Sequence, residues 1–201
     1  MVEDGFSREE VDLMGDSELL LTKRKVISKM ADRFSFVEGK FKQLMQSETG
    51  LHLPPGTLVK AGKVSRGENY KGLPYIVLDY PRLMTRHDVL NIRLLFWWGH
   101  YFTLSLHVAG GFWQERKPNI LKNIGALTFE KIRFQVDGSP WENDIFSGNF
   151  HDLNPSDSVQ TLSIEKSTFL RLSYYLPLHE IPNLDEFATK GFKKFMSILK
   201  D

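Results

Sequence analysis

Two runs of alternating apolar residues, on either side of FWWGHYF (96–102), constrain the fold more than any other feature. Every second residue in each run is large and apolar, the pattern of a strand with one buried face. These positions are Leu90, Ile92, Leu94 and Phe96 before the turn, and Phe102, Leu104, Leu106 and Val108 after it. A one-residue slip would move one apolar set to the other face, so Phe96 must pair with Phe102. We therefore predict an antiparallel hairpin over 88–108, with Trp98-Gly99-His100 as its three-residue turn.

The same register defines the opposite face of the hairpin. Arg93 and His107 lie diagonally on neighbouring strands of that face, close enough for long side chains to meet. Trp97 and Tyr101 share the face, and large aromatic side chains exposed to water would be unusual. We expect them to be covered by the turn-rich segment 137–160, by a ligand or by another subunit.

Amphipathic helices are predicted at both ends of the chain. The helical N-terminal segment (7–48) has apolar residues at steps of three and four, and the C-terminal helix (183–200) has one apolar stripe. Strand-like runs and turns occupy residues 57–176 between them. The 201 residues therefore predict a single α+β domain, with an antiparallel β-sheet and the amphipathic helices packed on one face.

The helical N-terminal segment is too long to fit straight inside such a domain. A helix over 17–47 would be about 46 Å long at 1.5 Å per residue, and a compact domain of this length is about 43 Å across. We therefore expect a bend or break at Gly39 or near 35–36.

Three connecting segments are predicted from their glycine and proline residues. Glycines bracket residues 66–72, which we expect to form a long hairpin loop. Pro118 suits the first turn of a short helix over 118–124. The turn-rich residues 137–160 are predicted to be a long loop, and such loops are often functional.

Composition and missing motifs exclude several kinds of site. The chain has no cysteine, and its six histidines show no HxH or HxxxH spacing, so we expect no disulfide, metal or cofactor. Neither GxSxG nor GxGxxG is present. The net charge of +1 argues against a nucleic-acid partner. No apolar run is long enough for a bilayer and no secretory signal is visible, so we expect a cytoplasmic protein without membrane contact.

The mixed face of the hairpin is the candidate ligand site. An arginine and a histidine among aromatic side chains suit a carboxylate or phosphate ligand. Asp79 joins them if the preceding strand pairs beside the hairpin. The candidate ligand-binding residues are Arg93, His107, Asp79, Trp97, Tyr101 and Tyr75. The alternative is an ordinary solvent-facing side of an antiparallel sheet.

These residues leave two functions open. The first is a non-catalytic binding or interaction protein that uses the aromatic-polar sheet face, or the hairpin tip at Trp98 and His100. The second is an enzyme for a small anionic substrate, with His107 as the catalytic acid or base and Arg93 as the anchor. The expected partner is a small anionic ligand, or a second copy of the chain in a homodimer.

Three stretches between residues 60 and 110 have a distinctive sequence. They are RGENYKGLPY (66–75), LDYPR (78–82) and FWWGH (96–100). Together they resemble an uncharacterised bacterial protein family. The resemblance implies a bacterial protein; it implies no activity and transfers no catalytic residue.

Overall fold

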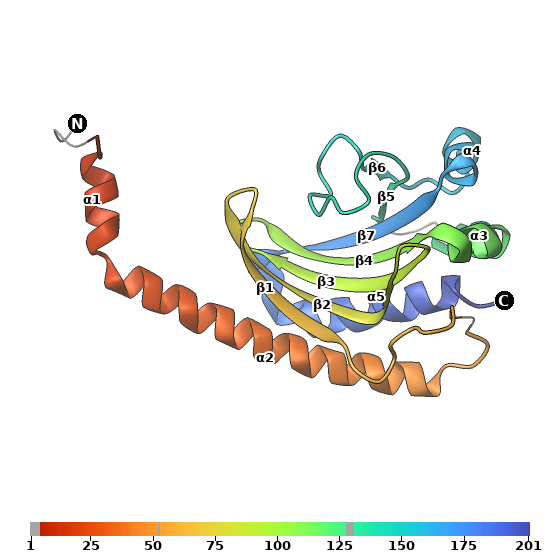
Figure 1. Ribbon diagram of the computed structural model, residues 1–201, viewed down its shortest axis with the longest axis horizontal. Helices are drawn as coiled ribbons and strands as arrows, with labels where there is room; N and C mark the ends of the chain where they lie inside the picture. The colour runs from red at the N-terminus through yellow and green to blue at the C-terminus, as the bar shows by residue number, and fades with distance from the viewer. Residues whose placement is uncertain (1–4, 52, 128–130) are drawn as a thin grey trace.

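The computed structural model describes residues 5–51, 53–127 and 131–201. It is an α+β structure in which helices pack against one face of an antiparallel sheet, as predicted (Figure 1). The α-helices of the described residues are α1 (Arg8–Gly15), α2 (Ser17–Ser47), α3 (Gly110–Ile124), α4 (Ser158–Lys166) and α5 (Leu184–Ile198). None of these helices combines the length and the apolar character that a membrane crossing needs.

The sheet has seven strands in the order β1-β2-β3-β4-β7-β5-β6, and every neighbouring pair is antiparallel. The strands are β1 (Lys63–Tyr70), β2 (Leu73–Met84), β3 (Asp88–Trp97), β4 (Tyr101–Ala109), β5 (Arg133–Gln135), β6 (His151–Asp152) and β7 (Phe169–Pro177). The first four strands form a meander, and β7 then pairs with β4 from more than 60 residues away.

The hairpin of β3 and β4 has the predicted register. Phe96 pairs with Phe102, Leu94 with Leu104, and this alignment continues to Leu90 and Val108. Gly99 takes the positive φ of 76° that the three-residue turn requires. The apolar pattern of the two strands was therefore sufficient to define their pairing.

The helix-facing side of the sheet carries the larger hydrophobic core. Helix α2 buries Phe34 and Phe41 there completely, and α5 buries Phe192. The rings of Phe41 and Phe192 stack with their centroids 4.1 Å apart, which joins the two helices over the sheet. The predicted packing on one face is confirmed for α2 and α5, whereas α1 buries no residue.

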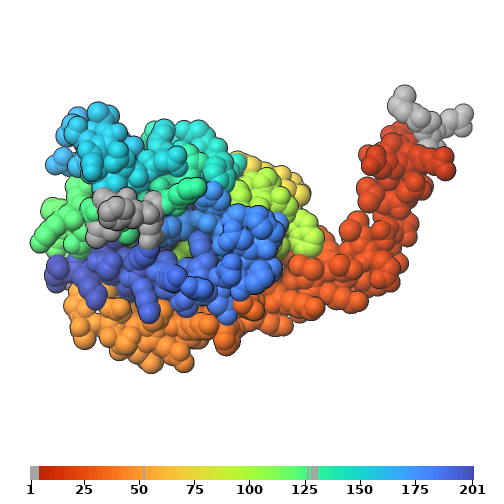
Figure 2. All heavy atoms as spheres, turned by 180° about the vertical axis from the view of Figure 1, so that it is seen from behind, coloured from red at the N-terminus to blue at the C-terminus, as the bar shows by residue number. Residues whose placement is uncertain are grey.

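The expectation of a break in the long helix is wrong. Helix α2 runs unbroken for 31 residues, through Gly39. That prediction assumed that the whole helix lies inside the compact body. Instead, its first turns project beyond the edge of the sheet and carry α1 away from the body (Figures 1 and 2).

Three connecting segments also differ from their prediction. Residues 66–70 belong to β1, and the hairpin turns at Lys71-Gly72, both with positive φ, a geometry that matches the twist of the strands. Pro118 lies in the middle of α3, because that helix already begins at Gly110. The segment 137–160 is not one loop, since it contains β6 and the start of α4.

Candidate functional site

Two rows of polar side chains cross the centre of the sheet, on the face away from α2 and α5. Strand register aligns the residues of each row directly opposite one another. The first row is Asp79, Arg93, Ser105 and Ser173, and the second is Asn91, His107, Arg171 and Gln135. All but Arg93 are buried, so these rows are not a solvent-facing side of the sheet.

Asp79 and Arg93 form a bidentate ion pair in the first row. Arg93 Nε lies 2.7 Å from Asp79 Oδ1, and Arg93 Nη2 lies 2.9 Å from Asp79 Oδ2. Asn91 Nδ2 also donates to Asp79 Oδ1 at 2.8 Å. Because β2 pairs with β3, Asp79 does reach the predicted cluster, and its carboxylate balances the charge of Arg93.

His107 is buried beside two positive charges. Burial disfavours its charged form, and the guanidinium groups of Arg171 and Arg93 add to the effect, so the pKa of His107 falls to about 3. The imidazole is therefore neutral at neutral pH. Its Nε2 atom is buried and has no hydrogen-bond partner in the described residues.

Arg171 is the buried cation whose hydrogen-bond acceptors are neutral. Its guanidinium donates to the carbonyl oxygens of Pro140 and Glu142, and to the amide oxygen of Asn143 at 3.0 Å. Burial, followed by the nearby charge of Arg93, lowers the pKa of Arg171 to about 10. Its Nε atom is buried and unpaired within the part of the chain that the structure describes.

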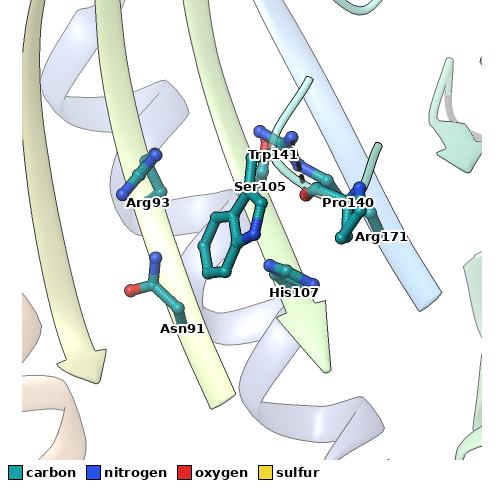
Figure 3. A pocket seen from close by; sticks show the side chains of 7 residues that line it. All are labelled: Asn91, Arg93, Ser105, His107, Pro140, Trp141 and Arg171. Carbon is teal, nitrogen blue, oxygen red and sulfur yellow. Dashed lines mark hydrogen bonds between the residues drawn. The ribbon is translucent and has the colours of Figure 1, made fainter. Parts of the chain in front are cut away.

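A small cavity lies between these groups (Figure 3). Its volume is about 10 Å³, which is room for about one water molecule. The lining residues are Asn91, Arg93, Ser105, His107, Pro140, Trp141 and Arg171. The indole of Trp141 lies over the strands among these side chains, with its ring centroid 5.1 Å from that of His107. Trp141 is 47% exposed, and its indole covers part of the cavity on the solvent side.

The aromatic residues predicted for this site form a separate cluster, toward the hairpin tip. Trp97 and Tyr101 are buried there, and Tyr75 packs against the cluster. Ile145 and Phe150 cover this cluster from above the sheet. The predicted site is therefore divided: one part is polar and holds the cavity, and the other is an apolar cluster.

Residues 137–150, here called the covering segment, are held on the sheet by side-chain hydrogen bonds. Asp144 accepts one from the hydroxyl of Tyr101 at 2.9 Å and one from Lys71 Nζ at 2.8 Å. Arg133 donates to the carbonyl oxygens of Ile145 and Phe150 at 2.8 and 2.9 Å. The aromatic face is thus covered by the chain itself, one of the three covers considered from the sequence.

The residues of the hairpin tip point to opposite sides of the sheet. His100 is exposed and stacks on Trp97, with ring centroids 3.5 Å apart. Trp98 is half-buried on the helix side, where it makes an edge contact with Phe96. The two residues therefore do not form one interaction surface.

Sequence reasoning missed Arg171 and Trp141. Arg171 stands out as a charge within an otherwise apolar strand, in phase with Ser173 and Tyr175. That signal marks a polar face, but only the pairing of β7 with β4 places Arg171 beside His107. Trp141 lies in a turn-rich segment, where periodicity carries no information.

The described residues contain no group of three or more His, Asp or Glu side chains placed to hold a metal ion. No protein-family model, no curated protein and no solved structure matches the chain significantly. The comparisons thus assign the chain to no family, and the bacterial origin expected from the resemblance lacks support.

Proposed function

We propose that this protein is a non-catalytic binding protein for a small oxyanion, with its site in the cavity beneath Trp141. One observation carries the proposal: the buried cation Arg171, with neutral hydrogen-bond acceptors, lies beside His107 and Arg93 at this cavity. A buried charge is costly unless it is paired, and an arginine suits carboxylate or phosphate groups.

Electrostatics at the cavity favour an anion. Asp79 forms an ion pair with Arg93, whereas Arg171 has no carboxylate bonded to its guanidinium. Burial and repulsion by the charge of Arg93 lower the pKa of Arg171, and the carboxylates of Glu142 and Asp79 offset only part of this. An anion between the two arginines would interact favourably with both and remove part of this repulsion. Binding would also favour a proton on His107, since its low pKa results in part from the same two cations.

The unpaired atoms indicate which oxyanion fits. Arg171 Nε is a donor, and His107 Nε2 can donate as well. Asn91 Oδ1 is buried and unpaired among the described residues, and it is an acceptor. An oxyanion that also carries a hydroxyl group satisfies both kinds of atom, so a hydroxycarboxylate is the class of ligand that we propose.

The side chain of Trp141 controls the access of a ligand to the cavity. The cavity holds about one water molecule when the indole covers it, so a ligand requires the indole to move outward. Half of the Trp141 side chain is already in solvent, and the covering segment stays anchored through Asp144 and Arg133. We propose that the side chain of Trp141 opens while the backbone of the segment remains in place.

The acid–base role expected of His107 has less support. A general acid or base works best with a pKa near the operating pH, and the pKa of His107 is about 3. A homodimer through the aromatic cluster has less support as well, because Ile145 and Phe150 already cover it. A cytoplasmic location without nucleic-acid partners remains a proposal, supported by the absence of cysteine and by the net charge of +1.

Calorimetric titration with glycolate tests this function, and acetate is the matched probe without the hydroxyl group. We expect glycolate to bind at pH 7 and low salt, and acetate to bind more weakly. His107→Asn should weaken glycolate binding about tenfold or more, the effect of losing a hydrogen bond to a charged group. His100→Asn is the control, because His100 is exposed at the hairpin tip. A wild-type protein that binds neither probe at millimolar concentration would disprove the proposal.

A further inference from the structure

An arm of the molecule, formed by α1 and the first turns of α2 (residues 8–25), projects away from the body (Figure 2). Each of its residues is exposed except Lys23, which is half-buried. The arm nevertheless carries large apolar side chains: Val11, Leu13, Met14, Leu19, Leu20 and Leu21. Met14 and Leu20 are 63% and 58% exposed. Large exposed apolar side chains gathered on one projecting segment are typical of an interaction site.

The apolar stripe of α2 continues from the core into the arm. Ile27, Phe34 and Phe41 follow one another at steps of seven residues, and all three pack in the core. Leu20 lies seven residues before Ile27 on the same stripe, beyond the edge of the sheet. The arm thus presents to solvent the same kind of surface that α2 buries elsewhere.

Apolar hollows of about 350 and 260 Å³ lie where α2 leaves the body. Val26, Met30 and Ile181 line both, so they form one continuous groove. Its other lining residues include Trp98 and Phe102 from the sheet and the cations Lys29 and Arg33. An amphipathic helix with an acidic polar face fits a groove of this composition.

The arm itself has that composition. Val11 and Met14 are three residues apart on one side of α1, which also carries the exposed Leu13 and the acidic residues Glu9, Glu10 and Asp12. Between residues 8 and 18 the acidic residues are Glu9, Glu10, Asp12, Asp16 and Glu18, against one arginine. Between residues 22 and 33 the basic residues are Lys23, Arg24, Lys25, Lys29 and Arg33, against one aspartate. Lys23 and Arg33 already pair with Glu68 and Asp185, so the positive charge offered to a partner comes from the other three. Helix α1 stands at a steep angle to α2 (Figure 1), so the segments that can align are the first turns of α2. Two of them crossing antiparallel near residue 20 would bring Asp16 and Glu18 of each copy close to Arg24 and Lys25 of the other.

The arm cannot fold back into the groove of its own chain. Only Asp16 lies between α1 and α2, and it caps the second helix through a hydrogen bond to the Leu19 amide at 3.0 Å. Antiparallel helix pairs need a loop of about two to five residues. A second copy of the chain is therefore the occupant that the geometry favours.

We propose that two copies of this protein form a homodimer through their arms. The first turns of α2 cross antiparallel near Leu20, and α1 of each copy enters the groove of the other. The interface is isologous, because the same arm and groove serve both chains. This dimer is independent of the oxyanion site, which lies on the opposite face of the sheet.

Sedimentation of the full chain between 1 and 100 μM tests the dimer. We expect a mass of twice 23.3 kDa, and a loss of association of at least tenfold in Leu20→Glu, with an unchanged melting temperature. Val159→Glu is the control, since Val159 is 73% exposed on α4. A wild-type monomer at 100 μM, or a Leu20→Glu variant that still dimerises, would overturn the proposal. So would a monomer whose arm binds lipid vesicles.

The absence of cysteine allows a second test of the geometry. Leu20→Cys should form a disulfide between copies under mild oxidation, because an axis near residue 20 brings the two thiols together. Val159→Cys should not. Reversing the charge in the first turn of α2 with Glu18→Lys should weaken the dimer, and adding Lys25→Glu should restore it. Failure of both the cross-link and the restoration would rule out this antiparallel arrangement.

Discussion

The two faces of the sheet are built by different means. The helix face is closed mainly by apolar side chains from α2 and α5, such as Phe41 and Phe192, and Arg33 of α2 adds one ion pair to Asp185 of α5 at the surface. The other face is closed by the covering segment, whose carbonyl and carboxylate oxygens accept hydrogen bonds from Arg133, Arg171 and Tyr101. The first face is stabilised mainly by the burial of apolar side chains. The second keeps unpaired polar atoms and a cavity, which a purely stabilising cover would not need.

The largest loss of stability should come from a substitution on the helix face. Phe192→Ala removes a fully buried ring that stacks on Phe41, and such changes cost about 3–5 kcal/mol. Urea unfolding of the whole chain measures the loss, and we expect one cooperative transition at a lower midpoint. A loss below about 1 kcal/mol would show that this face is not the main source of stability.

On the second face, Arg171→Met should lower the free energy of unfolding by less, about 2–3 kcal/mol. The substitution removes a buried cation but leaves the oxygens of Glu142 and Asn143 without their donor. We expect faster hydrogen exchange within the covering segment and little change in α2 and α5. Uniform acceleration over both faces would contradict their separate construction.

The pH dependence of stability should come from the second face. The pKa of His107 is about 3 in the folded state and about 6.5 when unfolded, so below pH 6.5 the unfolded state binds the extra proton. Stability therefore falls as the pH drops from 6.5 toward 3, by up to about 1.4 kcal/mol per pH unit. From pH 6.5 to 5 the loss should be about 2 kcal/mol. Urea midpoints for His107→Asn should be nearly flat over this range, and an equally steep decline would exclude His107 as the cause.

The smallest effect on stability should come from Trp141→Ala. Surface changes are usually within about 0.5 kcal/mol, and Trp141 is half-exposed. The same substitution opens the cavity, so glycolate should bind more tightly and associate faster. Phe146→Ala is the matched control, because Phe146 is a half-exposed aromatic residue of the same segment and does not line the cavity. Equal effects of the two substitutions on glycolate would contradict the role of Trp141 as a cover.

The same contrast explains what the sequence could predict. The register of β3 and β4 follows from apolar residues such as Phe96 and Phe102, because a wrong register would expose one of the two sets. The prediction that Asp79 joins the site also assumed that its strand pairs beside the hairpin, and the pairing of β2 with β3 confirms this. The polar cavity needs Trp141 and Arg171 beside His107, from which they are 34 and 64 positions away in the sequence. Local patterns carry no information about such distant pairs. The predicted break in α2 was wrong for a related reason, because the local sequence does not show that a helix can extend beyond the body.

The covering segment also determines when the second face can form during synthesis. Trp97 and Tyr101 emerge from the ribosome about 50 residues before Ile145 and Phe150, the side chains that cover them. At about 5–20 residues per second, the aromatic cluster stays uncovered for roughly 3–10 s. Strands β1 to β4 can pair within that interval, so the nascent chain displays a finished but bare aromatic surface. A cellular chaperone that recognises exposed aromatic side chains has its best opportunity to bind this protein during those seconds.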